Sequence, residues 1–311
     1  MEEKILQGSA KIMNNYKKLL FIINPNAGIQ KKDVPIPQIV NIFEDCGYET
    51  LICYTRKSGD GKLIVENHAN GNVDMIVCMG GDGTLNETFS GAIAVGWKKP
   101  IGYIPAGSTN DFATSLGLPT DLLEAARFIM KRRAKPLDLG LFNDRIFVYT
   151  ASTGIFTKTS YETPQKAKNI LGHFAYLMEG MKDLTNVHPF HMKIKTDAGV
   201  MEDNYIFVAI CNTFSLGGVM SLDEAGVDLN DGEFELLTIA NPRDLVQFNV
   251  IIRALYEQDY DEESSLVHLL KIKKADIEYN EADDWSLDGE KGEGRKNNHF
   301  EIKHNAVFMI Y

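Results

Sequence analysis

The sequence of 311 residues lacks several features that would assign it to a class at once. No apolar run approaches the roughly 20 residues that span a bilayer, and the opening segment MEEKILQGSAKIMNNYKK has no apolar signal core. The four cysteines form no CxxC pair, and two of them lie in apolar, strand-like runs. We therefore expect free thiols, in part buried, and a cytoplasmic location.

Positive charge is scarce as well. The chain has 32 Lys and Arg against 43 Asp and Glu, a formal net charge of −11. Proteins that bind nucleic acid need clustered Lys and Arg to displace counterions, so this balance argues against a nucleic-acid partner. The acidity is regional, because residues 257–290 alone hold 12 acidic side chains and 3 lysines. Contact between the rest of the chain and a membrane surface therefore stays open.

The common signatures of nucleotide-binding proteins are missing. The sequence contains no GxxxxGK[ST], and no GxGxxG follows an expected strand. The HRD and DFG elements of protein kinases are also absent. A P-loop NTPase, an ordinary dinucleotide-binding fold and a protein kinase are therefore not indicated.

The first 140 or so residues alternate between two patterns. The apolar runs KKLLFIINP, VDMIVCMGG and KPIGYIP are each followed by a glycine-rich loop and then by a stretch with helical spacing. Continuous apolar strands that alternate with helices predict a parallel sheet covered on both faces.

The remainder consists of short, alternating β-rich runs, such as NYIFVAICNT and HFEIKHNAVFMIY, which predict an antiparallel β-sandwich or barrel. From this change in hydrophobic pattern, from continuous to alternating runs, we place an N-terminal α/β domain at 1–137 and a C-terminal β domain at 138–299. A last strand near 300–311 can return to the first domain. One segment, 164–184, has helical spacing and is either a core-packing helix or part of an acyl pocket.

Three loops carry the strongest signal for chemistry. GGDGTLNE, AGSTNDFA and INPNAG each follow an expected strand, so they meet at the carboxyl edge of the sheet. Glycines allow close approach of a ligand, and a helix N-terminus attracts anions, which predicts a phosphate site. Thr84 and Glu87 predict a capping box. Asp82 would repel a phosphate unless a divalent cation lies between them.

Six segments together resemble one family. INPNAG, GGDGTLNE, AGSTNDFA, LDLG at 137–140, LNDGEFEL at 229–236 and LDGE at 287–290 resemble the diacylglycerol kinase catalytic-domain family, in its soluble bacterial lipid-kinase branch. The resemblance runs from about residue 17 to the C-terminus; GGDGT alone is shared with NAD kinases. It implies a three-layer, Rossmann-like α/β domain and a C-terminal β-sandwich, with ATP bound between them and its γ-phosphate transferred to a lipid hydroxyl with the help of Mg²⁺.

The resemblance also implies roles for individual residues. The functional carboxylates fall on Asp82, Asp111 and Asp138, and the proton acceptor falls on Asp288. The nucleotide-binding residues are Asn24, Gly28, Thr55, Gly81, Asp82, Gly83, Thr84, Leu85, Asn86, Glu87 and Ser108. A further metal site falls on the Asp231 carboxylate, with Asp228 and Glu233 contributing main-chain carbonyls. The segment before it departs from the family pattern, because Ala225 and Val227 stand where Pro-x-Ala is usual.

The expected activity is a lipid kinase that makes phosphatidic acid from diacylglycerol, or an analogous product from a related lipid alcohol. A sphingoid-base kinase, a NAD kinase-like enzyme and a non-catalytic binding module are the alternatives. The expected partner is a membrane lipid, met by transient contact with the inner face of the membrane. Seven basic residues are candidates either for touching anionic headgroups or for an ordinary solvated face: Lys131, Arg132, Arg133, Lys135, Lys158, Lys166 and Lys168. A homodimer is left open.

Overall fold

The computed structural model describes most of the chain. The described residues are 16–28, 34–69, 72–154, 189–212, 215–216, 220–221, 228–257, 266–279 and 284–311. The expected helix at 164–184 lies outside them.

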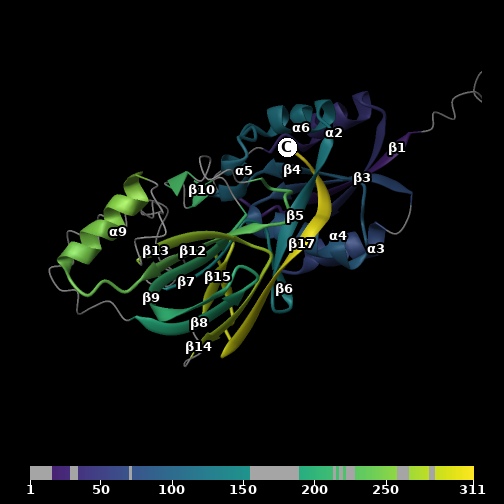
Figure 1. The fold of residues 1–311 in the computed structure, drawn as a ribbon. Helices are drawn as coiled ribbons and strands as arrows, with labels where there is room; N and C mark the ends of the chain where they lie inside the picture. Colours follow the sequence, from purple (N-terminus) through teal and green to yellow (C-terminus); the bar gives the residue numbers. More distant parts are fainter. Residues whose placement is uncertain are drawn as a thin grey trace, which may run out of the picture.

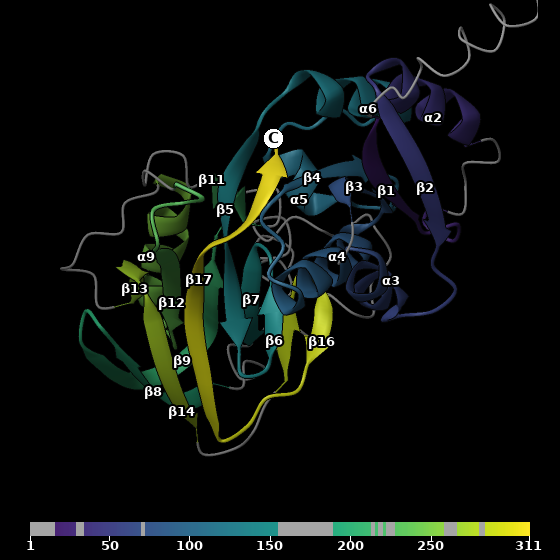
Figure 2. The same ribbon diagram turned by 90° about the vertical axis from the view of Figure 1, so that its right-hand side faces the viewer.

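The N-terminal part is built on four parallel strands in the order β4-β3-β1-β2. The strands are β1 (Lys17–Ile23), β2 (Tyr48–Tyr54), β3 (Val73–Gly80) and β4 (Pro100–Pro105). The helices are α2 (Ile36–Asp45), α3 (Asp60–His68), α4 (Asp82–Ala94), α5 (Asp111–Ser115) and α6 (Leu122–Lys131). Figure 2 shows α2 and α6 on one side of the sheet and α3 and α4 on the other.

Burial on both faces explains why β1 is a continuous apolar run. Leu19 and Phe21 pack in a cluster with residues of α2 and α6, while Leu20 and Ile22 pack with residues of α3 and α4. All four side chains are fully buried. Successive residues of a strand point to opposite faces, so a strand covered on both sides has no polar alternation.

The C-terminal part consists mainly of antiparallel strands around a second core that contains Phe142, Phe147, Trp285 and Phe300 (Figure 1). The strands are β5 (Ala134–Phe142), β6 (Arg145–Phe147), β7 (Thr150–Gly154), β8 (Phe190–Thr196), β9 (Val200–Cys211), β12 (Phe234–Ala240), β13 (Val267–Ile272), β14 (Lys274–Tyr279), β15 (Trp285–Leu287), β16 (Glu290–Gly292) and β17 (Asn297–Ile310). Helix α9 (Leu245–Glu257) and the short pair β10 (Ser215–Leu216) and β11 (Met220–Ser221) complete the described elements. The predicted fold class is confirmed.

Two long strands connect the two parts. β5 and β17 pair along their lengths, and the end of β17 also pairs with β4 in parallel through Phe308 and Met309. The register shifts between Lys303 and Val307, where Asn305 has a φ of 51°. The expected domain limit at 137/138 therefore falls inside β5, and the last strand joins the parallel and the antiparallel parts into one continuous sheet.

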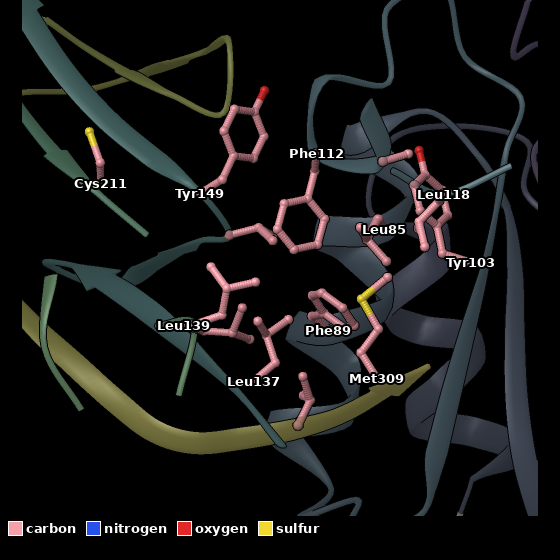
Figure 3. Close-up of a cluster of buried hydrophobic side chains, with 14 of the residues drawn as sticks. Leu85, Phe89, Tyr103, Phe112, Leu118, Leu137, Leu139, Tyr149, Cys211 and Met309 are labelled. Atoms are coloured by element: carbon pink, nitrogen blue, oxygen red, sulfur yellow. The ribbon is translucent and has the colours of Figure 1, made fainter. Parts of the chain in front are cut away.

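An apolar core also crosses between the two parts. Figure 3 shows Leu85 and Phe89 of α4 close to Leu137 and Leu139 of β5. The rings of Phe112 and Tyr149 stack across the same interface, with centroids 5.9 Å apart and an interplanar angle of 16°. This packing holds the ends of α4 and α5 against the β domain.

The four cysteines are free, as expected, and Cys78 and Cys211 are buried. None of the described helices is long and apolar enough to cross a membrane.

Candidate active site

The three glycine-rich loops meet at one edge of the parallel sheet, as their positions after β1, β3 and β4 predict. The Asn24 amide N–H bonds to the Met79 carbonyl at 2.9 Å, and the Ala106 N–H bonds to the Gly80 carbonyl at 2.7 Å. Nδ2 of Asn24 also donates to Oγ1 of Thr84 at 3.1 Å. The loops therefore form one continuous surface.

Glycine is required where two of these loops touch. A Cβ at Gly107 would lie 2.5 Å from the Cα of Gly81, and a Cβ at Gly28 would lie 2.3 Å from the Ala106 carbonyl oxygen. Gly28 also has a φ of 65°. The backbones approach each other more closely than any side chain allows, which leaves main-chain groups at the surface to meet a ligand.

The predicted capping box at Thr84 and Glu87 is wrong. Helix α4 begins at Asp82, with Gly81 as its N-cap and without a side-chain cap. The Glu87 carboxylate instead accepts hydrogen bonds from the N–H groups of Gly59 (2.6 Å) and Gly61 (2.9 Å). Glu87 thus caps the neighbouring helix α3 and holds the loop that follows β2, where Thr55 lies buried.

Asp82 has one carboxylate oxygen that is bonded and one that is not. Oδ2 accepts the N–H of Asp111 at 3.0 Å. Oδ1 is buried and has no hydrogen-bond partner among the described residues. The pKa of Asp82 is raised from 3.8 to about 6, first by burial and then by the negative charge of Asp111, with Asp288 adding to it. Asp82 therefore carries a buried, unpartnered oxygen and is destabilised as an anion by two other carboxylates.

Asp288 lies in the turn between β15 and β16 and is held by four donors. Oδ1 accepts the N–H groups of Tyr149 (2.9 Å) and Thr150 (3.1 Å), and Oδ2 accepts the N–H of Val148 (2.7 Å). Nδ2 of Asn86 donates to Oδ2 at 3.0 Å. Burial raises the pKa of Asp288 from 3.8 to about 6, although these four hydrogen bonds lower it. The side chain is fixed, and its affinity for a proton is suited to neutral pH.

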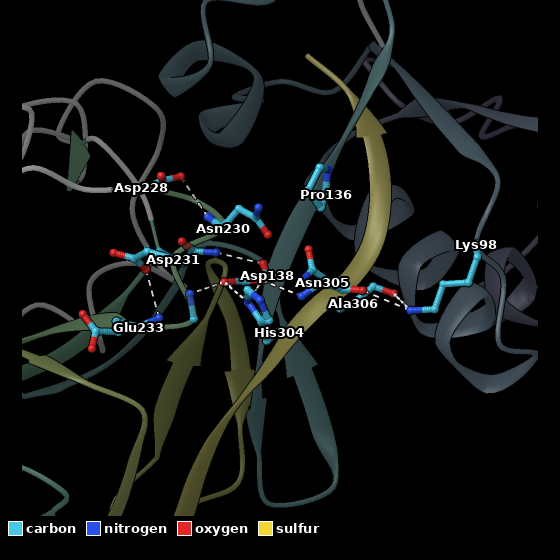
Figure 4. A network of polar contacts seen from close by, with 12 residues as sticks. Lys98, Pro136, Asp138, Asp228, Asn230, Asp231, Glu233, His304, Asn305 and Ala306 are labelled. Carbon is cyan, nitrogen blue, oxygen red and sulfur yellow. Dashed lines mark hydrogen bonds and ion pairs between the residues drawn. The ribbon is translucent and has the colours of Figure 1, made fainter.

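Asp138 lies apart from this group. It is fully buried where β5 meets β17. Its Oδ1 accepts the Asn305 N–H at 2.6 Å, its Oδ2 accepts the Gly232 N–H at 2.8 Å, and Nδ1 of His304 lies 3.0 Å from Oδ1 (Figure 4). Within the described chain, no hydrogen bond joins Asp138 to Asp82, Asp111 or Asp288. The contacts of Asp138 hold the shifted register of β17, and its catalytic role stays a prediction.

The Asp231 carboxylate already has two partners. Oδ1 accepts the Glu233 N–H at 2.9 Å, and Oδ2 lies 2.8 Å from Nζ of Lys271. Asp228, whose Oδ1 accepts the Asn230 N–H, belongs to the same loop (Figure 4). An ammonium group thus already contacts the carboxylate that the predicted metal would bind. The metal assignment stays a prediction, in which the ion competes with Lys271.

The residues at the converging loops fit both groups that the family resemblance implies. The buried, unpartnered Oδ1 of Asp82 is the kind of oxygen that Mg²⁺ coordinates, and a cation would relieve the repulsion with Asp111. The backbone contact between Gly81 and Gly107 leaves the room that phosphates need. Ser108 lies in this loop, whereas the Leu85 side chain is fully buried and can meet a nucleotide only through its main chain.

Sequence reasoning missed the segment 148–150. Its contribution to the site is three backbone N–H groups that hold Asp288. Backbone donors have no residue-type signature, so no pattern in the sequence marks them.

Comparison with known proteins agrees with this geometry. A model of the diacylglycerol kinase catalytic domain matches residues 18–142. A diacylglycerol kinase of Bacillus subtilis strain 168 is 31% identical over 277 residues, which cover 89% of this chain and 90% of that protein. One from Staphylococcus aureus strain MRSA252 is 33% identical over 223 residues, 72% of this chain and 70% of the relative. The crystal structure of a candidate diacylglycerol kinase from Bacillus anthracis strain Sterne superposes with a TM-score of 0.78 at 26% identity, covering 95% of both chains. The chain belongs to the diacylglycerol kinase family.

Proposed function

We propose that this protein transfers the γ-phosphate of ATP to the hydroxyl of a membrane lipid alcohol, with diacylglycerol as the acceptor and phosphatidic acid as the product. One observation carries the proposal. The carboxylate of Asp288, from the β domain, accepts a hydrogen bond of 3.0 Å from Asn86 of α4, the helix that begins at Asp82 in the phosphate loop of the α/β domain. A proton acceptor therefore stands beside an anion-binding loop, as transfer of a phosphoryl group to an alcohol requires.

The residues divide the work between them. The loops 24–28, 81–87 and 106–111 bind the phosphates, and Glu87 acts through the loop at 58–61. Asp82 and Asp111 are the residues that would hold Mg²⁺, and a bound Mg²⁺ would neutralise charge on the phosphate oxygens. Asp288 orients the acceptor hydroxyl and takes its proton late in the transfer. To do so, it exchanges one of its four hydrogen bonds for the hydroxyl; Asn86 is the only donor among them that is a movable side chain.

The acceptor follows from the relatives in Bacillus and Staphylococcus, which are named diacylglycerol kinases. Sphingoid bases and other lipid alcohols share the reacting group and differ only in the shape of the pocket that they need. To reach a lipid acceptor, this protein, located in the cytoplasm, makes transient contact with the inner face of the membrane. A NAD kinase-like activity is the second candidate, because it uses the same GGDGT loop.

The test is an assay with labelled ATP and Mg²⁺ against diacylglycerol, monoacylglycerol, ceramide, a sphingoid base and NAD. We expect labelled phosphatidic acid. Labelled NADP would support the second candidate instead, and no labelled product from any acceptor would contradict a kinase.

The variant Asp288→Asn separates chemistry from folding. It is expected to abolish transfer, because an amide accepts no proton. We also expect the variant to lose about 1 to 3 kcal/mol in the free energy of unfolding, because its new NH₂ group would face N–H donors that the carboxylate now satisfies. Thermal unfolding measured beside the assay distinguishes the two effects, and near-normal turnover would refute the role of Asp288.

A further inference from the structure

Tyr149 belongs to the candidate site through its side chain as well as through its main chain. Its N–H holds Oδ1 of Asp288 at 2.9 Å, and its carbonyl accepts the N–H of Asn212 at 2.9 Å. Its ring stacks on Phe112, the residue that follows Asp111, with the ring centroids 5.9 Å apart. Contacts at the main chain and at the ring thus fix the position of this phenol between two parts of the site.

The hydroxyl of Tyr149 has no hydrogen bond to any residue that the structure describes. The residue is only 8% exposed. Oδ1 of Asp82 is a fully enclosed oxygen without a partner, but the Tyr149 hydroxyl is not, so the remaining exposure of Tyr149 includes this group. Figure 3 shows the hydroxyl pointing away from Leu137 and Leu139 of the apolar core. A nearly buried donor without a partner costs free energy, which a ligand that accepts its hydrogen bond recovers.

The phenol lies in the field of three carboxylates. Burial raises the pKa of Tyr149 well above its ordinary value, and the negative charges of Asp82, Asp288 and Asp111 raise it further. The hydroxyl therefore keeps its proton at neutral pH and serves as a donor. Among these charges, Asp82 of the phosphate loop has the largest effect, followed by Asp288. The donor is thus close to both groups between which a phosphoryl group has to pass.

Tyr103 shows the contrasting case at the same loops. Its hydroxyl lies 3.2 Å from the Gly80 carbonyl oxygen and 3.3 Å from Oδ1 of Asn110, so its hydrogen-bonding capacity is used within the protein. In the described chain, Tyr149 has no such acceptor. A hydrogen bond to an ionised acceptor is roughly twice as strong as one between neutral groups. A phosphate oxygen is therefore a better partner for Tyr149 than the hydroxyl of a lipid.

We propose that the Tyr149 hydroxyl donates a hydrogen bond to an oxygen of the γ-phosphoryl group and holds that group between the phosphate loop and Asp288. The proton stays on Tyr149 throughout, and the proton of the lipid hydroxyl still goes to Asp288. Tyr149 is thus a catalytic residue in addition to the carboxylates. This inference rests on the proposed kinase function.

The test uses Tyr149→Phe, which removes the hydroxyl but keeps the ring that stacks on Phe112 and the N–H that holds Asp288. Calorimetric titration in Mg²⁺ compares the binding of ADP with that of adenylyl imidodiphosphate, an ATP analogue that is not hydrolysed. We expect the variant to bind ADP as the wild type does and the analogue roughly ten- to a hundredfold more weakly, because a hydrogen bond to a charged group contributes that much. The kcat/KM for the lipid acceptor should fall by a similar factor, while the unfolding temperature stays the same.

Tyr205→Phe is the matched control. It also removes one phenolic hydroxyl, from a side chain that is 3% exposed in the core of the β domain. Its affinities for ADP and for the analogue should equal those of the wild type. Should Tyr149→Phe fail to fold, Phe112→Leu replaces it, because losing the stacked ring frees the phenol and should weaken binding of the analogue more than binding of ADP.

The outcomes separate this inference from the kinase function. An unchanged preference for the analogue over ADP in Tyr149→Phe, or in Phe112→Leu where that variant is used, would overturn the inference alone. A higher KM for diacylglycerol at unchanged nucleotide affinities would also overturn it, since the hydroxyl would then contact the lipid. A wild type that binds neither nucleotide would overturn the kinase function and this inference with it.

Discussion

Nδ2 of Asn86 donates a hydrogen bond of 3.0 Å to Oδ2 of Asp288, although the two residues are 202 positions apart in the sequence. Asn86 lies in the second turn of α4, which begins at the phosphate loop. Asp288 lies in a tight turn of the β domain, with a φ of 52°. The contact therefore joins the loop that binds phosphate to the proposed proton acceptor.

The variant Asn86→Ala should shift the pH profile of turnover. It removes a hydrogen bond that favours the ionised form of Asp288, so the pKa of Asp288 rises further. Because Asp288 must be ionised to accept a proton, the acid limb of kcat/KM for the lipid acceptor, which reports the free enzyme, should move to higher pH by about one unit. The measurement is kcat/KM for the lipid acceptor between pH 5 and 9, with the KM for ATP recorded at each point.

Ser90→Ala is the matched control for this variant. Ser90 lies one turn further along α4 and contacts Oδ1 of Asn86 at 3.4 Å, without touching Asp288. Its pH profile should equal that of the wild type. If Asn86→Ala instead raised the KM for ATP and left the acid limb in place, Asn86 would be a nucleotide contact alone.

The variant Asp82→Asn should stabilise the metal-free protein at neutral pH. Folding raises the pKa of Asp82 from 3.8 to about 6. Between pH 3.8 and pH 6, Asp82 is therefore protonated to a larger extent in the folded chain than in the unfolded chain. Stability therefore falls as pH rises through this window, and an amide escapes the loss. We expect a gain in the free energy of unfolding on the order of 2 kcal/mol at pH 7 and none near pH 4, measured by urea denaturation with a chelator present. A variant less stable than the wild type at pH 7 would refute this account.

The variant Asp138→Asn tests whether this carboxylate supports the fold or the reaction. Its amide would face the N–H of Gly232 or of Asn305, so a buried donor would lose its acceptor. We expect a loss of about 3 kcal/mol in the free energy of unfolding, with kcat at low temperature largely kept. A loss of turnover at unchanged thermal stability would instead support the catalytic role that the family resemblance implies.

These residues show which parts of the site a sequence can reveal. The phosphate loops were predictable because a buried strand, a run of glycines and a following helix are all local patterns, and Gly28, Gly81 and Gly107 lie where those patterns place them. The division into continuous apolar strands of a parallel sheet and alternating strands of an antiparallel part was predictable for the same reason. Periodicity reports whether one face or both faces of a strand are covered.

Contacts between distant segments were not predictable in this way. Glu87 fits the local pattern of a capping box, yet its carboxylate accepts hydrogen bonds from Gly59 and Gly61. These two residues precede β3 in the sequence, and only the folded chain places them beside Glu87. The contacts of Asp138 with Gly232 and Asn305 could not be read from its motif, because they depend on the register of β17, which is set by pairing across the sheet. Likewise, Lys271 reaches Asp231 only because β13 pairs with β12.

The pair of Lys271 and Asp231 makes the divalent-ion dependence of this loop testable. The ammonium lies 2.8 Å from Oδ2 of Asp231, and this contact raises the pKa of Lys271, so the charge persists at neutral pH. Glu235 is buried opposite Lys271 on the paired strand, and burial raises its pKa to about 7. Removing the ammonium would leave Asp231, Glu233 and Glu235 as an acidic group without its closest cation.

We therefore expect Lys271→Met to create a dependence on Mg²⁺ or to strengthen one. Without metal, the variant should unfold at a lower temperature than the wild type, because the carboxylates repel one another. Added Mg²⁺ or Ca²⁺ should restore it, since hard cations bind carboxylate oxygens, and the rise in melting temperature with metal should exceed that of the wild type. Asp231→Ala in the same background should abolish the extra rise, while Lys273→Met, which removes a more exposed lysine 3.7 Å from Glu233, should leave the metal response as it is in the wild type. Equal metal responses in the wild type and in Lys271→Met would show that Lys271 and the ion do not compete for Asp231.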